Sequence, residues 1–248
     1  GPYPEPSFPK LIGYMQRRAI IFLIVFIDLI GFGIVLPMLP LYAERFGAKG
    51  LMIGLIVASF SIMQVIFSPF WGRLSHRIGR RPVLLISVGT GVLSYILFAF
   101  GSAQEGSLAL TLILISRILA GACGGNINVT QAYIADITPS KHRAAGMGLI
   151  GMAFSLGLIC GPAIGAFSSH WGLAAPACVA AMLSSVSFFL ALFILKESLL
   201  PEHRKKVNSV KHPNRWMIWK GALQHPQIGS LCVFLFISTF CFSCYEVT

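Results

Sequence analysis

Charged side chains are scarce in this sequence. They make up 11% of its 248 residues and the acidic residues number only 8, whereas 56% of the residues are hydrophobic and the mean hydropathy is +0.78. A water-soluble domain of this length could not bury so much apolar surface, because the area that a chain can cover is limited by its size. The composition therefore excludes a soluble globular domain and favours a chain that lies in a lipid bilayer.

The sequence also lacks the patterns of enzymes, metalloproteins and disulfide-rich proteins. We find no nucleophile motif, metal-ligand cluster or phosphate-binding loop. The cysteines number 6, and all fall within apolar runs without pairing or ligand spacing, so we interpret them as small core residues. We therefore expect neither catalysis nor a cofactor.

Long apolar runs recur along the chain. A bilayer core of about 30 Å needs roughly 20 mostly apolar residues per helix. The predicted spans are 19–41, 51–71, 83–101, 108–132, 146–168 and 173–195, and a further one begins near residue 229. We therefore predict an all-α membrane protein with a cytoplasmic segment at 1–17, a six-helix bundle at 18–196, a basic cytoplasmic interdomain loop at 197–228 and an incomplete seventh helix at 229–248.

Basic residues fall almost entirely on one side of these spans. Of the 19 lysines and arginines, 16 lie on the side of the N-terminus, Arg45 and Lys49 lie on the other, and Arg117 lies within a span. Cytoplasmic loops carry such an excess of basic residues, so the N-terminus is expected in the cytoplasm. This placement explains the net charge of +11 without nucleic acid.

Two charged residues are predicted at mid-membrane depth. Asp28 follows the start of the first span by nine residues, which is a rise of roughly 14 Å, and Arg117 lies at a similar depth in the fourth span. The two charges can therefore meet, and an intramembrane charge is by default a functional hypothesis. A change in their pairing could gate proton uptake and release; the alternative is a structural ion pair that only fixes helix packing.

Polar or small residues form stripes on two spans. In the fourth span the stripe comprises Gly121, Gly124, Asn128 and Gln131, and in the second it comprises Ser61, Gln64 and Ser68. Residues three and four apart share a helix face. These faces line either a substrate cavity or interhelical hydrogen bonds.

Two further patterns lie in the second cytoplasmic turn and the fifth span. The turn from Gly72 to Pro82 holds four arginines and His76, which pair either with acids such as Asp136 or with lipid headgroups. The fifth span carries Gly157, Gly161 and Gly165 around Pro162, which allows a close helix approach.

Together these residues resemble the major facilitator superfamily, and specifically the drug:proton antiporters that include the tetracycline efflux proteins. The resemblance covers 17–200. It rests on the turn from Gly72 to Pro82, on Arg117 with Gly121 and Gly125, on Gly157 to Gly165, on the segment from Asp28 to Pro40, and on Tyr133 to Asp136.

The resemblance implies a fold and roles for these residues. The fold would be the N-terminal bundle of two inverted three-helix repeats. Asp28, Arg117 and Gln64 would lie at proton-coupling or substrate-cavity positions, together with Asn128 and Gln131 from the polar stripe. The expected cytoplasmic gating network comprises Gly72, His76, Arg77, Gly79, Arg80, Arg81, Asp136 and Arg143, and Gly161-Pro162 would lie at a helix contact between halves.

Two residues depart from the family pattern. His76 stands where the family's cytoplasmic turn carries an acid, so the gating network loses a negative charge. Ser94 stands where tetracycline efflux proteins carry an acid in the third span, which weakens tetracycline as the specific substrate.

The resemblance implies proton-coupled export of an amphiphilic, drug-like small molecule across a bacterial inner membrane, with the proton gradient as energy source. The alternatives are a facilitator of another solute, such as a sugar or metabolite, and a non-transporting membrane scaffold. Family members need about twelve helices, so we expect either a fragment, a truncated product, or a half-transporter that pairs with a second chain.

Overall fold

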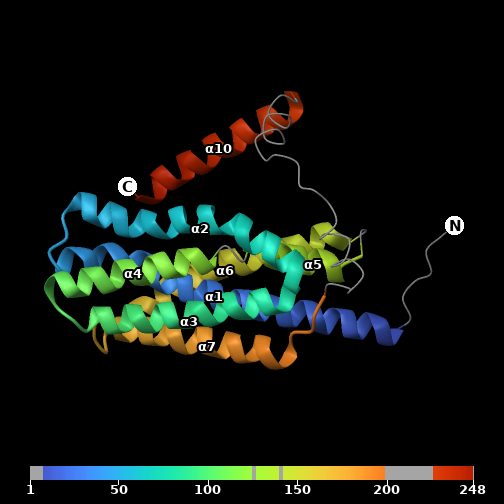
Figure 1. Ribbon diagram of the computed structural model, residues 1–248, viewed down its shortest axis with the longest axis horizontal. Coiled ribbons are helices and arrows are strands. Elements are labelled where there is room, and N and C mark those ends of the chain that lie inside the picture. The colour runs from blue at the N-terminus through green and yellow to red at the C-terminus, as the bar shows by residue number, and fades with distance from the viewer. Residues whose placement is uncertain (1–7, 125–126, 140–141, 199–225, 248) are drawn as a thin grey trace. The chain divides into compact units, whose positions relative to one another are not determined.

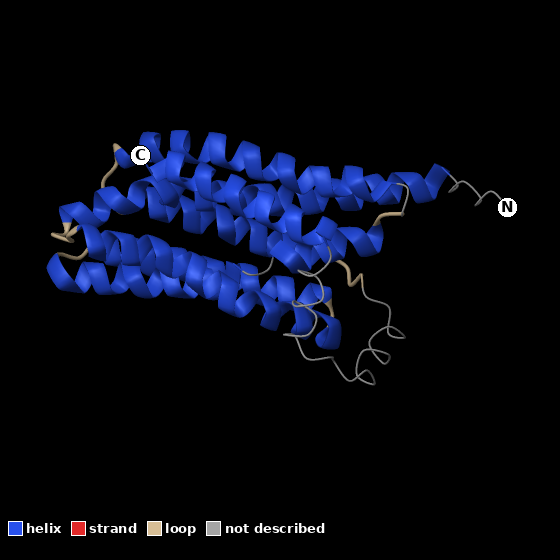
Figure 2. Ribbon diagram, turned by 90° about the horizontal axis from the view of Figure 1, so that it is seen from above, coloured by secondary structure: helices blue, strands red, loops and turns tan. Residues whose placement is uncertain are grey.

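The structure is a computed structural model that describes residues 8–124, 127–139, 142–198 and 226–247. Over these residues the secondary structure is helical, without a strand (Figure 2). The helices are α1 (Phe8–Arg45), α2 (Gly50–Ile78), α3 (Arg80–Ser102), α4 (Gly106–Gly124), α5 (Ile127–Ile137), α6 (Arg143–Ser169), α7 (Ala175–Ile194) and α10 (Pro226–Val247). The predicted all-α fold class is confirmed.

Six helical stretches of the described chain are long and apolar enough to cross a membrane. They are Ala19–Arg45, Gly50–Ile78, Arg80–Ser102, Gly106–Ile137, Arg143–Ser169 and Ala175–Ile194. Each stretch matches a predicted span, although several helices extend beyond the apolar residues. For example, α2 continues past Arg73 and Arg77 to Ile78. The fourth comprises both α4 and α5.

The chain forms two compact units, residues 1–205 and 206–248. In the first unit the six spans run alongside one another as a bundle (Figure 1). The second unit contains α10, where a seventh helix was predicted, and its apolar part is Ile228–Thr239. Most of the predicted interdomain loop lies outside the described residues.

The packing of the bundle is reciprocal. The first span, α1, packs on α6 and α7, and the fourth, α4, packs on α2 and α3, while α3 also packs on α7. Exchange of the first three spans with the last three leaves this pattern unchanged, as expected for two inverted three-helix repeats.

Large hydrophobic side chains cover the outside of the bundle. Leu51 is 82% exposed, Val65 75% and Phe193 80%. Water is a poor solvent for such a surface, and the helices satisfy their own backbone hydrogen bonds, so the bundle suits a hydrocarbon surrounding. The first unit is an integral multi-pass membrane protein.

Small residues allow a close contact between α1 and α6. A Cβ atom added to Gly161 would lie 2.6 Å from Gly33 Cα, and one added to Gly157 would lie 2.7 Å from Leu29 Cβ. Gly165 faces Ile34 in the same way. The glycine face of α6 thus packs on α1 within the bundle, with the half-buried Pro162 beside it, and the expected contact of Gly161-Pro162 between halves stays a prediction.

Candidate functional site

All six spans contribute to one cavity in the bundle, with a volume of about 350 Å³. Its wall is mainly hydrophobic and includes Phe32, Phe60 and Phe154. Its polar and charged lining residues are Asp28, Ser61, Gln64, Ser87, Tyr95, Arg117, Thr130 and Ser184. An apolar cavity with a few convergent polar groups is the usual form of a small-molecule site.

Asp28 extends from α1 toward α7. Its Oδ1 accepts a hydrogen bond of 3.3 Å from Ser184 Oγ. Ser187, one turn further along α7, donates to the Ile24 carbonyl at 3.1 Å. These two buried serines therefore hold the Asp28 turn of α1 against α7. Ser184 and Ser187 are not among the residues predicted from the sequence, although their three-residue spacing in a span whose buried face is otherwise Pro176 and alanines was a usable signal.

Arg117 is 3% exposed and lies against aromatic rings of α3. Its Cζ is 5.0 Å from the centroid of Phe98 and 5.9 Å from that of Tyr95. A guanidinium over an aromatic face gains cation–π attraction, which is stronger where water is excluded. Arg117 Nε and Nη2 are nevertheless buried without a hydrogen-bond partner.

The structure places Asp28 and Arg117 in one cavity but does not pair them. Asp28 is bound by Ser184 and Arg117 lies over rings, so the structural ion pair left open by the sequence is not formed. Tyr95 borders both environments: its hydroxyl lies beside Gly31 on α1, and its ring centroid is 5.9 Å from Arg117 Cζ. Tyr95 is not among the residues predicted from the sequence.

The two polar stripes lie against each other. Gln64 Nε2 donates to the Gly124 carbonyl at 3.0 Å, and Asn128 Nδ2 donates to Ser68 Oγ. Gln64 also lines the cavity, whereas Asn128 and the exposed Gln131 do not. Both residues are exposed, and their expected role at a substrate cavity stays a prediction.

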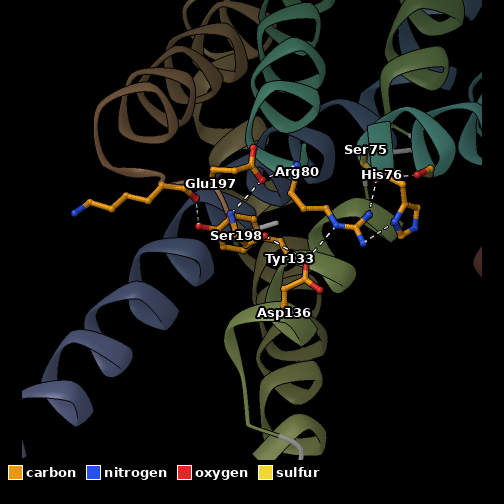
Figure 3. A network of polar contacts seen from close by, with 9 residues as sticks. Ser75, His76, Arg80, Tyr133, Asp136, Glu197 and Ser198 are labelled. Atoms are coloured by element: carbon orange, nitrogen blue, oxygen red, sulfur yellow. Dashed lines mark hydrogen bonds and ion pairs between the residues drawn. The ribbon is translucent and has the colours of Figure 1, made fainter. Parts of the chain in front are cut away.

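A second polar cluster joins α2, α3 and α5 at the end predicted to be cytoplasmic (Figure 3). Arg80, 4% exposed, donates from Nε to Asp136 Oδ2 at 3.2 Å and from Nη1 to Ser75 Oγ at 2.6 Å. Its Nη2 lies 3.5 Å from His76 Nδ1. The predicted pairing of this turn with Asp136 is thus present in the structure.

The remaining residues of the expected gating network differ in environment. Gly79 adopts a φ of +112°, which other residues rarely reach, so it permits the sharp turn between α2 and α3. Arg81 Nη2 donates to the Leu192 carbonyl of α7 at 2.7 Å. Arg77 and Arg143 are exposed, and Gly72 is half-buried with open space beside its Cα.

No group of three or more histidine, cysteine, aspartate or glutamate side chains gathers among the described residues as a metal ion would require. The fold and the cavity together define an integral membrane protein whose helix bundle surrounds a solute-sized space containing a carboxylate and a guanidinium. The chain belongs to the Major Facilitator Superfamily, whose sequence profile matches residues 21–247.

Several characterised proteins are similar to the chain. The class E tetracycline resistance protein of Escherichia coli is 38% identical over 178 residues, which is 71% of this chain and 42% of that protein. Multidrug resistance protein 2 of Bacillus subtilis (strain 168) is 32% identical over 224 residues, 90% of this chain and 54% of that protein. The chain thus spans about half the length of the relatives it matches.

A solved structure shares this fold. The crystal structure of the human organic anion transporter MFSD10 (TETRAN) superimposes with a TM-score of 0.65 at 27% identity, covering 81% of this chain and 50% of that one. The matched part is again about half of the other protein.

Proposed function

We propose that the chain is the N-terminal half of a secondary transporter that exports amphiphilic, drug-like small molecules in exchange for protons. The observation that carries the proposal is the largely hydrophobic cavity in which Asp28 and Arg117 lie unpaired. Relatives named as tetracycline and multidrug resistance proteins support drug export as the solute class.

Asp28 is the proton carrier in this proposal. A carboxylate in an apolar cavity can be neutralised by a proton or by a cation. Ser184 holds Asp28 toward α7, away from Arg117, so a movement of α1 relative to α7 changes its partner and releases or takes up the proton. Gln64 and the aromatic wall contact the solute.

The Arg80 cluster is the cytoplasmic gate. Arg80 and Asp136 join α3 to α5, and Ser75 and His76 join both to α2, so these contacts hold the cytoplasmic helix ends together. When they separate, the cavity gains access to the cytoplasm. No bound cofactor is needed, since the proton gradient supplies the energy.

A whole transporter of this kind requires a partner for the bundle. We place residues 1–17 in the cytoplasm, 18–196 in the first bundle, 197–228 in a basic cytoplasmic linker and 229–248 in the first helix of a second bundle. That partner is either a following six-helix half or a second chain, and the membrane is a bacterial inner membrane with the N-terminus cytoplasmic.

The test is proton-coupled efflux of a fluorescent cationic dye from inverted vesicles. The 248-residue chain is compared with a form that carries its natural downstream sequence. We expect the extended form to pump, Asp28→Asn to abolish pumping, and Glu105→Gln, which changes an exposed acid at the opposite end, to leave it intact.

If neither form moves dye or protons, drug efflux is excluded as the function. The facilitator of another solute is then tested by uptake of labelled sugars and metabolites, and a protein that moves none of them fits the scaffold alternative.

A further inference from the structure

The chain leaves α7 along a path that crosses the Arg80 cluster. α7 ends at Ile194, and Leu195 is extended, with its side chain 5% exposed in the core formed with Trp71 and Tyr133. Lys196, Glu197 and Ser198 follow, and we call these three residues the exit segment. Its contacts connect the end of the sixth span to the start of the third (Figure 3).

Glu197 makes the contact on which the inference depends. Its Oε1 accepts a hydrogen bond of 2.9 Å from the backbone N–H of Arg80, which is the first residue of α3. The first N–H groups of a helix lack partners within the helix, and a side chain at the preceding position usually accepts from one of them. Gly79 occupies that position and offers no side chain, so Glu197 caps α3 from 117 residues away.

The charge of Glu197 suits this position. A helix N-terminus favours a negative group, and the neighbouring turn contributes Arg73, Arg77, Arg80 and Arg81. Asp136 and Glu197 are the acids that contact Arg80 in the described structure. The family pattern expects an acid at position 76, and this chain has His76 there.

The rest of the exit segment reinforces the same cluster. Tyr133 donates its hydroxyl hydrogen to the Lys196 carbonyl, and Ser198 Oγ donates to Asp136 Oδ2 at 3.3 Å. Asp136 Oδ2 is therefore shared between Arg80 and Ser198. The exit segment contacts α3 and α5 at the two residues that form the ion pair.

We propose that Glu197 is a positioning residue: it caps α3, holds Arg80 in reach of Asp136, and supplies at the end of α7 the negative charge that His76 does not provide. Glu197 is thereby added to the proposed cytoplasmic gate. The capping contact does not depend on the proposed function, but any effect of Glu197 on transport rests on it. Movement of the exit segment then opens the ion pair.

The capping contact is tested by residue-resolved hydrogen exchange of the Arg80 amide in lipid nanodiscs, which requires no transport. Glu197→Ala removes the acceptor, so exchange of this amide should accelerate by about tenfold or more, as loss of a charge-assisted hydrogen bond predicts. Glu197→Gln keeps an oxygen acceptor and should accelerate it less. Lys196→Ala changes a neighbouring exposed side chain and should leave the amide unchanged.

The positioning role is tested by a double-mutant cycle on thermal unfolding with Glu197→Ala and Asp136→Asn. If both act through Arg80, the double variant should lose less stability than the two single losses added together. Adding His76→Asp to Glu197→Ala should recover part of the lost stability, because it returns an acid to the Arg80 cluster, without restoring protection of the Arg80 amide.

Three results would overturn the inference: an Arg80 amide that stays protected in Glu197→Ala, strictly additive losses in the cycle, or no recovery with His76→Asp. Transport is measured separately. If wild-type protein fails to transport, the proposed function is wrong, while the exchange and unfolding results still decide the role of Glu197.

Discussion

At the scale of single residues, the cavity separates two opposite charges that sequence spacing predicted would be able to meet. The cost of leaving Arg117 with two unpartnered nitrogens in a membrane is several kcal/mol in order of magnitude. An intramembrane charge is by default a functional hypothesis, and in the function we propose Arg117 exchanges partners, with Asp28 in the same cavity as the other partner. The separation of Asp28 from Arg117 therefore favours the proton-coupling hypothesis over a structural ion pair that only fixes helix packing.

Ser184 should control how readily Asp28 is neutralised. The Ser184 hydroxyl donates to the carboxylate, so Ser184→Ala should increase the labelling of Asp28 by a hydrophobic carbodiimide, to whose central carbon the protonated carboxyl group adds. We expect roughly a threefold or greater increase at neutral pH, in line with one lost hydrogen bond of about 1 kcal/mol. Mass spectrometry of the labelled peptide measures it.

Ser185→Ala is the matched control for this prediction. Ser185 Oγ donates to the Ala181 carbonyl of its own helix at 2.7 Å and does not contact Asp28. Equal labelling of Asp28 in wild type and in both variants would show that Ser184 does not stabilise the carboxylate.

At the scale of helices, glycine determines how α1 and α6 meet. Gly161→Ala places a methyl group within 2.6 Å of Gly33 Cα, and backbone on both sides leaves no side chain to move away. Such overpacking costs about 1–3 kcal/mol, so the thermal unfolding temperature in detergent should fall. Gly148→Ala, also in α6, meets no atom within 4 Å and should leave unfolding unchanged or slightly raise its temperature.

A result in which Gly148→Ala destabilises as much as Gly161→Ala would contradict the packing explanation. Both variants add the same methyl group to the same helix, so only the neighbour of the glycine differs. The comparison therefore isolates the α1–α6 contact.

The helices were predictable from the sequence because bilayer thickness imposes a length and a composition on every span. Asp28, Arg117, Gln64 and the pairing of the cytoplasmic turn with Asp136 were predictable because charge and polarity are rare in such helices. The partners of these groups were not. Whether Asp28 faces Ser184 or Arg117 depends on how α1 is rotated about its axis relative to α7. The residue pattern of a single helix does not determine that rotation.

The role of Glu197 also could not be predicted from the sequence, because it depends on a contact between distant parts of the chain. Glu197 follows the last span in a polar segment where an acid carries no signal, and only the folded chain brings it 117 positions back to Arg80. Asn128 and Gln131 continue the predicted stripe of the fourth span, but they do not line the cavity that Gln64 lines.

At the scale of the whole molecule, the distribution of charge predicts the orientation in the membrane. The ends predicted to be cytoplasmic hold 16 lysines and arginines, and the opposite ends hold 2. Positively charged loops resist translocation, so single substitutions should not invert the protein. We therefore expect a cysteine in place of Glu105 to react with a membrane-impermeant maleimide in intact cells, and a cysteine in place of Arg77 to react only after the membrane is opened.

Both positions are exposed and lie in or beside a connection between helices, so they differ chiefly in the side of the membrane. The background protein needs its own cysteines replaced, since Cys178 is exposed on the same α3–α4 and α6–α7 end as Glu105. Labelling of position 77 from outside would reverse the orientation. The Arg80 cluster and the exit segment would then face the exterior, and a cytoplasmic gate at Glu197 would have to be abandoned even if its contact with Arg80 were real.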